Sequence, residues 1–578
     1  MKILNLFKES MRIRFFVFLW AALLIVGSSP VFADTSSQIL REQDQQQEHD
    51  SLYDNFLTTP RPSTIETAPK LKENKRTPPT TIFIKSIVVQ GYTVISSYNI
   101  FEITSKFENR QLTIHDFRTI IGQLDALYTQ KGYITSFAYL PPQHFSQDTL
   151  IINVFEGKIG KIKINGNHYF SNKTINRYLT FEPNQILNYY PLKSNLDYLN
   201  RNPDRYAKAT IESGTAPGTS DININVHDQF PIHFKYDYDN EGSKYIGHNE
   251  YHTSIWDTNF LGLDHTASYG YTTSPDHELV AWNLGYSLPI GLNDTLNFTA
   301  QHSQTHLGAN LKPLEVYGKS TTYTGTWTRI LLQTQTWTAH ANLGFAYKNN
   351  YDLFLETYFD RGRDDLREIT YGGDINHLDP LGRTYFNAAI LTGIPDFLGG
   401  LKYKDPQATV LGSGGQFTKA TLDLIRLQKL PFNTVLIWNT ETQQSSATLP
   451  SAEQFQAGGI TNNRGYPAGD LVGDAGYSSS WNLAIPLYPI PRDWMIPFTK
   501  STIYNSIKLV PFYDWARVVT YKPSAGTKKD GDLRSVGVGL QGNVSKYVSW
   551  KIEYAWPLGQ PATDQKKSRL LTSLSVSF

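Results

Sequence analysis

From Pro231 to the last residue the chain alternates apolar and polar residues, and helical periodicity disappears. The clearest run lies in residues 337–347, where every second residue is apolar: Trp337, Ala339, Ala341, Leu343, Phe345 and Tyr347. A period of two places successive side chains on opposite faces of a β-strand. The polar face stays polar throughout, and the stretch is too long for one soluble sandwich. The pattern therefore predicts a transmembrane β-barrel with apolar side chains outside and polar ones inside.

About 16 candidate strands fit between His233 and Phe578, at roughly 22 residues for each strand with its connection. The final strand ends in Leu574, Val576 and Phe578, with serines on its other face. The chain also carries 35 Tyr, 30 Phe and 11 Trp, enough for aromatic girdles at two membrane interfaces. The sequence thus predicts an antiparallel barrel of about 16 strands over residues 231–578.

The chain offers little chemistry for catalysis or metal binding. It contains no cysteine, which excludes disulfide frameworks, thiolate metal sites and cysteine nucleophiles. No Gly-x-Ser-x-Gly elbow, His-Glu-x-x-His pair or phosphate-binding loop occurs, so we expect no enzyme, no cofactor and no metal. A formal net charge of +1 gives no global field for nucleic acid. Apart from residues 15–27 there is no long apolar run, which excludes a helical membrane protein.

The first 80 residues suggest three segments. Residues 1–33 have a basic start, an apolar core too short to span a bilayer and a small-ended cleavage site, as in a secretory signal peptide. Residues 34–56 are rich in Gln, Glu and Asp and predict a polar helix over Gln38–Asp50. Residues 57–80 predict an extended linker because of their prolines: Pro60, Pro62, Pro69, Pro78 and Pro79.

Residues 81–230 form two consecutive α/β units in which the same order of elements recurs. For the first unit, residues 81–157, the pattern predicts a helix at Thr113–Gln130. It predicts strands at Ile82–Gln90, Ile134–Leu140 and Thr149–Glu156. For the second, residues 158–230, it predicts strands at Ile159–Asn165, Ala207–Glu212 and Asp221–Val226, with helices after Ser171 and at Leu192–Leu199. A strand–helix–helix–strand–strand plan that recurs within about 75 residues is an internal repeat.

Five motifs carry a resemblance that covers nearly the whole chain after residue 33. They are Asn202-Pro203-Asp204-Arg205, Gly214–Asp221, Asp239–Ser243, Asn259–Asp264 and Tyr286–Gly291. Through them the chain resembles the TpsB transporters of two-partner secretion, in which two POTRA domains precede a 16-stranded outer-membrane barrel. The resemblance implies POTRA domains at 81–157 and 158–230 and identifies the polar helix of residues 34–56 with the family's N-terminal plug helix.

Two further motifs imply how the barrel lumen is organised. Gly458-Gly459 followed by Arg464-Gly465-Tyr466 is similar to the tip of a loop that, in this superfamily, folds back into the barrel. The segment Phe512-Tyr513-Asp514-Trp515-Ala516 resembles an inner-wall motif on the fourth strand from the end. The resemblance implies that the Arg464 guanidinium pairs with the Asp514 carboxylate, a contact for which a planar fork is well suited. The site residues expected from it are Arg464, Gly465, Tyr466, Phe512, Asp514 and Ala516. Two positions differ from the usual family pattern: Asn463 replaces a valine and Ala516 replaces a glycine.

Two charged groups outside these motifs have simpler interpretations. His248, Glu250 and His252 share one strand face, but two histidines on one strand rarely hold a metal ion without a partner strand. We therefore expect a solvated barrel face there. Asp364, Asp365 and Glu368 lie among arginines, and such mixed charge is typical of a loop between strands.

The resemblance implies a transporter in the outer membrane of a Gram-negative bacterium that exports one large TpsA-type protein without nucleotide. The POTRA domains would receive the unfolded secretion domain of this partner in the periplasm, and outer-membrane lipids would surround the barrel. Two alternatives remain open, a barrel-assembly insertase of the same superfamily and a passive porin or receptor. The sequence does not distinguish an adhesin, a cytolysin, a contact-dependent toxin and an iron-acquisition protein as the partner, nor does it give the oligomeric state.

Overall fold

The computed structural model describes residues 65–67, 81–144, 148–243, 245–275, 277–308, 312, 316–354, 359–497, 502–523, 529–544 and 547–578. These residues belong to two compact units. One runs from Ile232 onward without Gly262–Asp264, and the other contains the residues up to Pro231 together with Gly262–Asp264. The predicted signal peptide, the plug helix of residues 34–56 and most of the linker lie outside the described residues.

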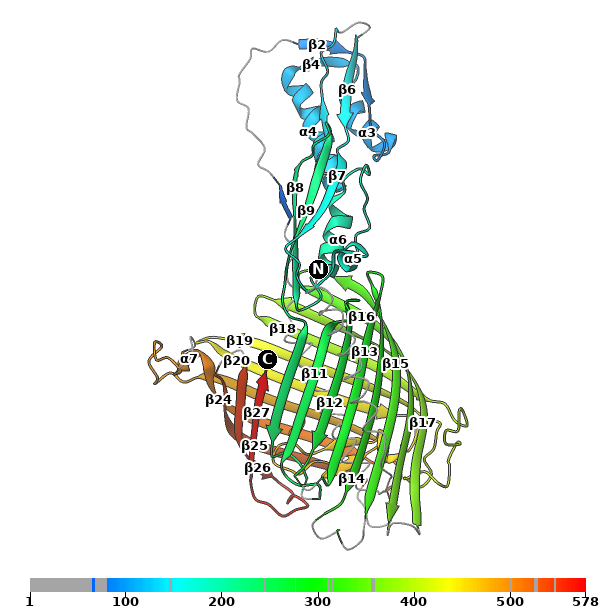
Figure 1. Ribbon diagram of the computed structural model, residues 1–578, viewed down its shortest axis with the longest axis vertical. Coiled ribbons are helices and arrows are strands. Elements are labelled where there is room, and N and C mark those ends of the chain that lie inside the picture. Colours follow the sequence, from blue (N-terminus) through cyan, green and yellow to red (C-terminus); the bar gives the residue numbers. More distant parts are fainter. Residues whose placement is uncertain are drawn as a thin grey trace, which may run out of the picture. The chain divides into compact units, whose positions relative to one another are not determined.

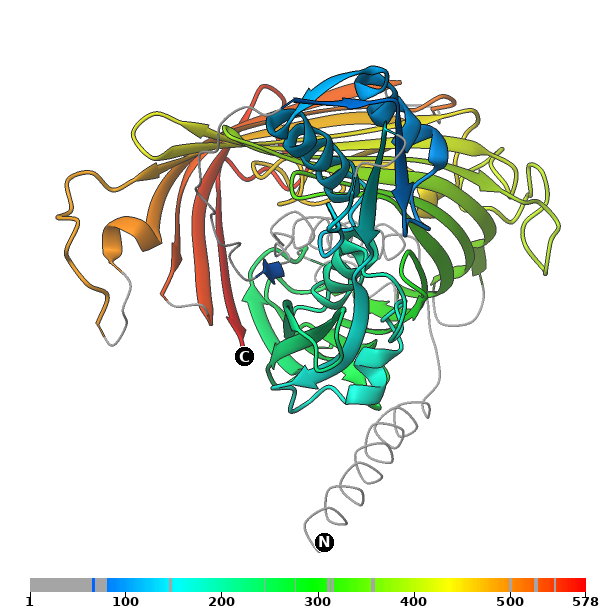
Figure 2. The same ribbon diagram turned by 90° about the horizontal axis from the view of Figure 1, so that it is seen from above.

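Sixteen strands of the described chain close into one antiparallel barrel, drawn from green to red in Figure 1. The first strand pairs with the last from Lys235↔Ser577 to Asp239↔Ser573, and the C mark in Figure 2 shows the end of the chain after the last strand. This barrel confirms the predicted fold class. Its strands are β10 (Ile232–Asp239), β11 (Glu250–Phe260), β12 (His265–Thr273), β13 (Leu279–Ile290), β14 (Asp294–His306), β15 (Tyr317–Gln333), β16 (Trp337–Phe354), β17 (Phe359–Asp379), β18 (Gly382–Gly393), β19 (Thr418–Leu430), β20 (Thr434–Ser445), β23 (Ala475–Pro486), β24 (Ile507–Val519), β25 (Asp530–Asn543), β26 (Val548–Leu558) and β27 (Arg569–Ser577).

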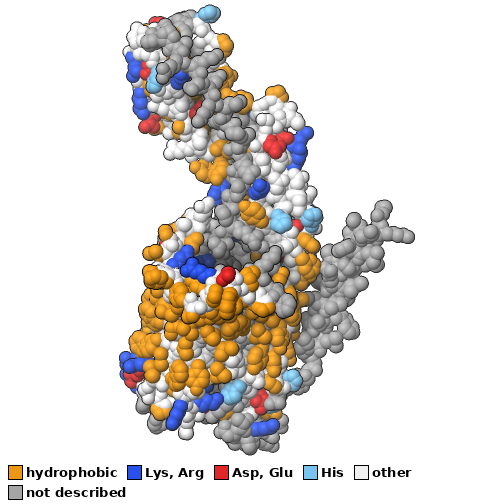
Figure 3. Space-filling view, turned by 90° about the vertical axis from the view of Figure 1, so that its left-hand side faces the viewer, with side chains coloured by type: hydrophobic (Ala, Val, Ile, Leu, Met, Phe, Trp, Pro, Cys, Tyr) orange, Lys and Arg blue, Asp and Glu red, His pale blue; other side chains and the backbone are white. Residues whose placement is uncertain are grey.

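The barrel wall carries apolar side chains outside and polar side chains inside, the reverse of a soluble protein. On β26, Ile552, Tyr554 and Trp556 are 46, 39 and 40% exposed, whereas Glu553 between them is 3% exposed. On β25 the same alternation leaves Val536 exposed and buries Ser535. In Figure 3 the hydrophobic side chains form a band across the face of the barrel that the view shows. Such a band is stable against the hydrocarbon chains of lipid, so the wall follows the predicted apolar-out pattern.

Most connections at one rim of the barrel are short, with residues 487–506 as the exception, and several at the other rim are long. Short connections such as residues 291–293 and 334–336 lie at the rim where β10 begins. The other rim carries longer connections, among them residues 394–417 and 446–474. We name residues 446–474 the lumen loop. It contains η4 (Ser451–Glu453), β21 (Phe455–Ala457) and β22 (Leu471–Gly473), and β21 pairs with β22.

Residues 86–228 form two α/β units that share one topology. Their sheets have the orders β3-β6-β5 and β7-β9-β8. In each unit the first strand runs parallel to the last, and the middle strand pairs with the last in antiparallel fashion. The predicted internal repeat is therefore present, and none of the described helices is long and apolar enough to cross a membrane. The elements are β3 (Ser86–Gln90), α3 (Ser97–Thr104), α4 (Ile114–Gln130), β5 (Phe137–Tyr139), β6 (Thr149–Phe155), β7 (Lys158–Asn165), α5 (Asn172–Asn176), α6 (Tyr189–Leu199), β8 (Arg205–Ser213) and β9 (Thr219–Asp228).

Two details differ from the sequence prediction. The expected strand Ile82–Gln90 is wrong as a single element, because it breaks at Lys85 into β2 (Thr81–Ile84) and β3. β2 pairs with β4 (Arg110–Thr113), while the Lys85 amide donates to the Asp148 carbonyl oxygen at 2.7 Å. Within the predicted linker, three residues form β1 (Ile65–Thr67), which extends the second sheet by lying parallel to β8.

The same turn follows the first strand of each α/β unit. Gly91 and Gly166 have φ values of +84° and +85°. A Cβ atom on either would lie 2.5 Å from the carbonyl oxygen of a residue on the unit's last strand. Both the left-handed conformation and the lack of space require glycine. An acid at the end of the last strand then accepts hydrogen bonds from the amides of the turn: Glu156 from Thr93 and Val94, and Asp228 from His168, Tyr169 and Phe170.

Replacing Glu156 with glutamine should lower the stability of the first α/β unit at neutral pH but not in acid. Burial raises the pKa of the Glu156 carboxyl, but hydrogen bonds from Thr93 and Val94 outweigh it and hold that pKa below its usual value of 4.5. A depressed pKa contributes stability above the unfolded value, and this contribution is lost as the pH falls through the folded value. Pulse proteolysis in urea should give wild type the higher midpoint at pH 7, and the difference should disappear once the pH falls below the lowered folded-state pKa of Glu156.

The exposed Glu102 provides the control for this prediction, because Glu102→Gln should leave the midpoint unchanged at both pH values. A Glu156→Gln midpoint equal to that of wild type at pH 7 would contradict the stabilising role of the Glu156 charge.

Candidate functional site

The lumen loop folds inward and places Arg464 against the inner wall of the barrel. The Gly459 amide donates to the Tyr466 carbonyl oxygen at 3.1 Å, and the Asn463 amide donates to the Gly459 carbonyl oxygen at 3.0 Å. Gly458 and Gly459 have φ values of +110° and +85°, which side chains rarely allow. The two glycines therefore permit the tight turn that presents Arg464, and this side chain is only 5% exposed.

Arg464 and Asp514 form a bidentate ion pair. The guanidinium donates from Nε to Asp514 Oδ2 at 3.0 Å and from Nη2 to Oδ1 at 2.7 Å. The backbone amide of Arg464 adds a third bond to Oδ2 at 3.1 Å. Asp514 lies on β24 and is fully buried. The structure therefore brings together the arginine and the aspartate, which lie 50 residues apart in the sequence.

Three further polar residues complete this cluster, and the sequence interpretation did not identify them. Glu553 on β26 accepts from Arg464 Nη1 at 2.9 Å. Ser480 on β23 and Ser535 on β25 donate to the Asp514 carboxylate at 2.7 and 3.2 Å. The only sequence signal for them is alternation, because each is a polar residue on the inward face of its strand. Alternation marks every residue that faces the lumen equally and cannot single out these three.

The other expected site residues surround the ion pair. The Phe512 ring lies below the guanidinium, with Arg464 Cζ 3.4 Å from the ring centre, where a cation is attracted to the aromatic face. The Tyr466 hydroxyl donates to the backbone carbonyl oxygens of Leu558 at 3.1 Å and Gln560 at 3.0 Å. Ala516 is fully buried and packs in an apolar cluster with Tyr466. All six residues expected from the motifs thus lie at one place.

The electrostatics of the cluster explain how it can hold a loop. One guanidinium faces two carboxylates, and Lys551 Nζ, 3.7 Å from Glu553 Oε2, adds a second positive charge. Removing one partner from a buried pair costs roughly 3–5 kcal/mol, because the remaining charge stays without compensation. The fork geometry also fixes the direction of the contact. The arrangement is suited to fastening the tip of the lumen loop to β24 and β26.

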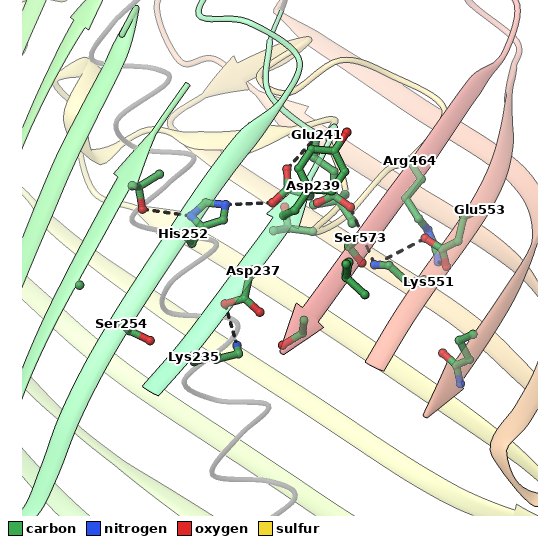
Figure 4. Close-up of a pocket in the computed structure, with 18 of the residues that line it drawn as sticks. Lys235, Asp237, Asp239, Glu241, His252, Ser254, Arg464, Lys551, Glu553 and Ser573 are labelled. Carbon is green, nitrogen blue, oxygen red and sulfur yellow. Dashed lines mark hydrogen bonds and ion pairs between the residues drawn. The ribbon is translucent and has the colours of Figure 1, made fainter. Parts of the chain in front are cut away.

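Arg464 and Glu553 also line a polar cavity inside the barrel, of about 470 Å³, which Figure 4 shows. Across it lie Lys235, Asp237 and His252, from β10 and β11. Charged walls of this kind favour water and a polypeptide backbone over an apolar ligand.

The two charged groups outside the motifs take different positions from those expected. His252 receives a partner from the neighbouring strand, because its Nε2 lies 2.9 Å from Asp239 Oδ2, while His248 is bound instead to the Gly242 carbonyl oxygen. The acidic group was expected in a loop, which is wrong. Asp364, Asp365 and Glu368 are buried and lie within β17, where the strand continues past the apolar band as a ribbon paired with β16.

Replacing Gly465 with alanine should release the loop tip. A Cβ atom there would lie 2.6 Å from Ser535 Cβ and 2.9 Å from the Pro557 backbone nitrogen, so the chain must move. Such overpacking costs about 1–3 kcal/mol, which corresponds to roughly a tenfold faster cleavage after Arg464 by trypsin. The cleavage rate of the detergent-solubilised protein measures the effect. Gly325→Ala, whose Cβ would meet only the Phe298 ring at 3.7 Å, should cleave at the wild-type rate.

Comparisons with known proteins cover nearly the whole described chain. Residues 218–542 match a family model described as haemolysin secretion/activation protein ShlB/FhaC/HecB. Residues 82–157 match the model of the ShlB-type POTRA domain. Among curated relatives, the heme/hemopexin transporter protein HuxB of Haemophilus influenzae is 24% identical over 82% of this chain and 83% of its own length. The outer membrane transporter CdiB of Dickeya dadantii is 22% identical over 80% of each chain.

Solved structures show the same fold. CdiB from Escherichia coli superposes with a TM-score of 0.70 at 19% identity, covering 95% of this chain and all of that one. A BamA structure from Haemophilus ducreyi that lacks POTRA domains 1–3 has a TM-score of 0.52 at 15% identity and covers 86% of this chain and all of that one.

Proposed function

The chain belongs to the haemolysin secretion/activation family ShlB/FhaC/HecB, the TpsB transporters of two-partner secretion, and from this premise we propose that it exports one large TpsA-type protein through its barrel. The barrel lies in the outer membrane and the POTRA domains lie in the periplasm. The proposal includes export without nucleotide, transport in place of catalysis, and gating by the lumen loop.

One observation carries the gating proposal. The tip of the lumen loop is bound inside the barrel by the buried pair of Arg464 and Asp514. A polypeptide in transit needs the space that this loop takes, so the loop has to leave the wall for export to proceed. The bond is electrostatic and the cavity beside it is polar, and therefore the separated charges can be hydrated once the lumen fills with water. The gate is thus reversible without chemical energy.

The two α/β units, residues 81–157 and 158–230, are proposed to be the POTRA domains that receive the unfolded partner. Sheet edges bind extended peptides through backbone hydrogen bonds, with little demand on sequence. The chain provides an internal example, because β1 adds in parallel to the β8 edge from Ile65↔Ala209 to Thr67↔Ile211. A strand of the partner could add to an edge in the same way.

Co-expression with a TpsA-type protein in a Gram-negative host tests the proposal. The partner should accumulate in the medium or on the cell surface only when this chain is present, and the amounts of unrelated outer-membrane barrels should stay the same. Loss of those barrels on depletion of this chain would instead favour the alternative, a barrel-assembly insertase. The chain shares its fold with the BamA structure. A partner that stays in the periplasm would overturn export.

A further inference from the structure

A second buried charge cluster holds the lumen loop near its beginning. Glu453 ends η4, eleven residues before Arg464, and is fully buried. Each oxygen of its carboxylate meets one lysine. Oε1 lies 2.5 Å from Lys348 Nζ on β16, and Oε2 lies 2.5 Å from Lys419 Nζ on β19. Because both lysines belong to the barrel wall, the carboxylate ties the loop to the two strands at once.

The cluster contains a second buried glutamate. Lys348 also pairs with Glu368 on β17, at 2.9 Å, so two lysines face two buried glutamates. The backbone carbonyl oxygen of Glu453 accepts from Gln443 Nε2 at 3.0 Å. Removal of the Glu453 charge would leave two lysines to share one carboxylate in a buried setting, which is costly.

The turn before Glu453 is held as well. The Ala452 amide donates to Asp364 Oδ2 at 3.2 Å, and the Ser451 amide donates to Thr409 Oγ1 at 2.9 Å. Thr409 is itself bound to β17, because its hydroxyl donates to Asp364 at 2.7 Å. Around the turn, apolar side chains exclude water from the bonds: Leu366, Leu401, Ala408, Phe417, Leu449 and Ala452.

The two clusters lie on different segments of the barrel wall. In the closed order of sixteen strands, Glu453 is held from the seventh and tenth, β16 and β19, and Arg464 from the thirteenth and fifteenth, β24 and β26. Lys348 on β16 holds Glu453, and Glu553 on β26 holds Arg464. The lumen loop therefore has two attachments, to wall segments that share no strand. A loop fixed at one point could swing aside, whereas a loop fixed at both ends stays in the pore.

Resting on the proposed function, we propose that Glu453 is a second positioning residue of the gate, and that export requires its release from Lys348 and Lys419. The chemistry fits a contact that must open. Desolvation offsets most of the Coulomb attraction in a buried ion pair, so such a pair fixes position while its separated and hydrated state lies close in free energy. An apolar contact of the same area would resist exposure to water instead.

A disulfide across this attachment gives the sharpest test. The chain has no cysteine of its own, so Thr409→Cys with Ser451→Cys introduces one unique pair at a place where the Ser451 amide already contacts the Thr409 side chain. Oxidation should lower export of a TpsA-type partner at least tenfold, and a reductant should restore it. Heat-modifiable migration of the barrel in gels shows that the variant is folded. Full export by the oxidised form would overturn the inference, whereas absence of export by wild type would overturn the proposed function.

Glu453→Gln provides a second and independent readout. The cross-link between positions 409 and 451 should then form several-fold more slowly, because the loop spends less time on this wall. Adding Lys419→Met should change the rate little further, since partners in one contact are not additive. Asp530→Asn on β25, which removes one partner of an exposed pair with Arg517, is the matched control and should leave the rate unchanged. A Glu453→Gln variant that cross-links at the wild-type rate would show that its charge does not position the loop.

Discussion

Export should fall at least about tenfold when Arg464 is replaced by alanine, and by a similar factor when Asp514 is replaced instead. Each substitution leaves the opposite charge buried: Asp514 is fully buried and Arg464 is 5% exposed. The remaining charge stays uncompensated inside the confined lumen at a cost of roughly 3–5 kcal/mol, so the loop rests in a misplaced position that still obstructs the export path.

The double variant separates a direct contact from two independent effects. Since the two residues act through one bond, Arg464→Ala with Asp514→Ala should export almost as much as either single variant. Arg464→Lys should also be defective, because one ammonium cannot bind both carboxylate oxygens of Asp514 while also reaching Glu553. Partner protein in the medium, normalised to the amount of each variant in the outer membrane, measures all four.

Arg517 supplies the matched control on the same strand. It pairs with Asp530, but both side chains are more than half exposed, at 56 and 54%. Exposed pairs contribute only about 0–1 kcal/mol, so Arg517→Ala should export normally. If the two alanine substitutions at Arg464 and Asp514 reduced export additively, a direct contact between the two side chains would be contradicted, even if each residue were important for export.

Deleting residues 82–228 should reduce export to background while the barrel still reaches the outer membrane. The hydrogen bonds that close the barrel all join strands between Ile232 and Ser577, so the barrel keeps its own framework. Recognition of the partner is proposed to reside in the deleted units. Cell fractionation and heat-modifiable migration report on the barrel, and partner protein in the medium reports on export. Normal export by the shortened chain would refute the separation into two modules.

The barrel could be predicted from sequence because its chemistry repeats with every strand. A strand with lipid on one face and the lumen on the other has to alternate apolar and polar residues. This alternation recurs from β10 to β27. The prediction weakens where lipid no longer dictates the pattern. In β17 the segment with Asp364, Asp365 and Glu368 continues as strand beyond the apolar band, lacks an apolar face and was therefore interpreted as a loop. Backbone pairing with β16, which sequence periodicity does not register, keeps it extended.

The candidate site was predictable only in part, for a geometric reason. Arg464 and Asp514 were linked through a family motif, since no local rule relates residues 50 positions apart. Glu553 and Glu453 carry no motif of their own in the sequence interpretation. Their roles follow from which strands the lumen loop meets inside the barrel, and this depends on the closure of the whole ring.

The attachment of the lumen loop to two separate segments of the wall also bears on the order of folding. Glu453 needs Lys348 from β16, and Arg464 needs Glu553 from β26, so the contacts span residues 348 to 553. Contacts of such sequence separation form late, because the intervening chain must first be ordered. The loop can dock at both ends only after the strands that supply both segments have assembled. Its docking thus marks the completion of the barrel, and a newly inserted chain is expected to pass through an open, conducting stage before it closes.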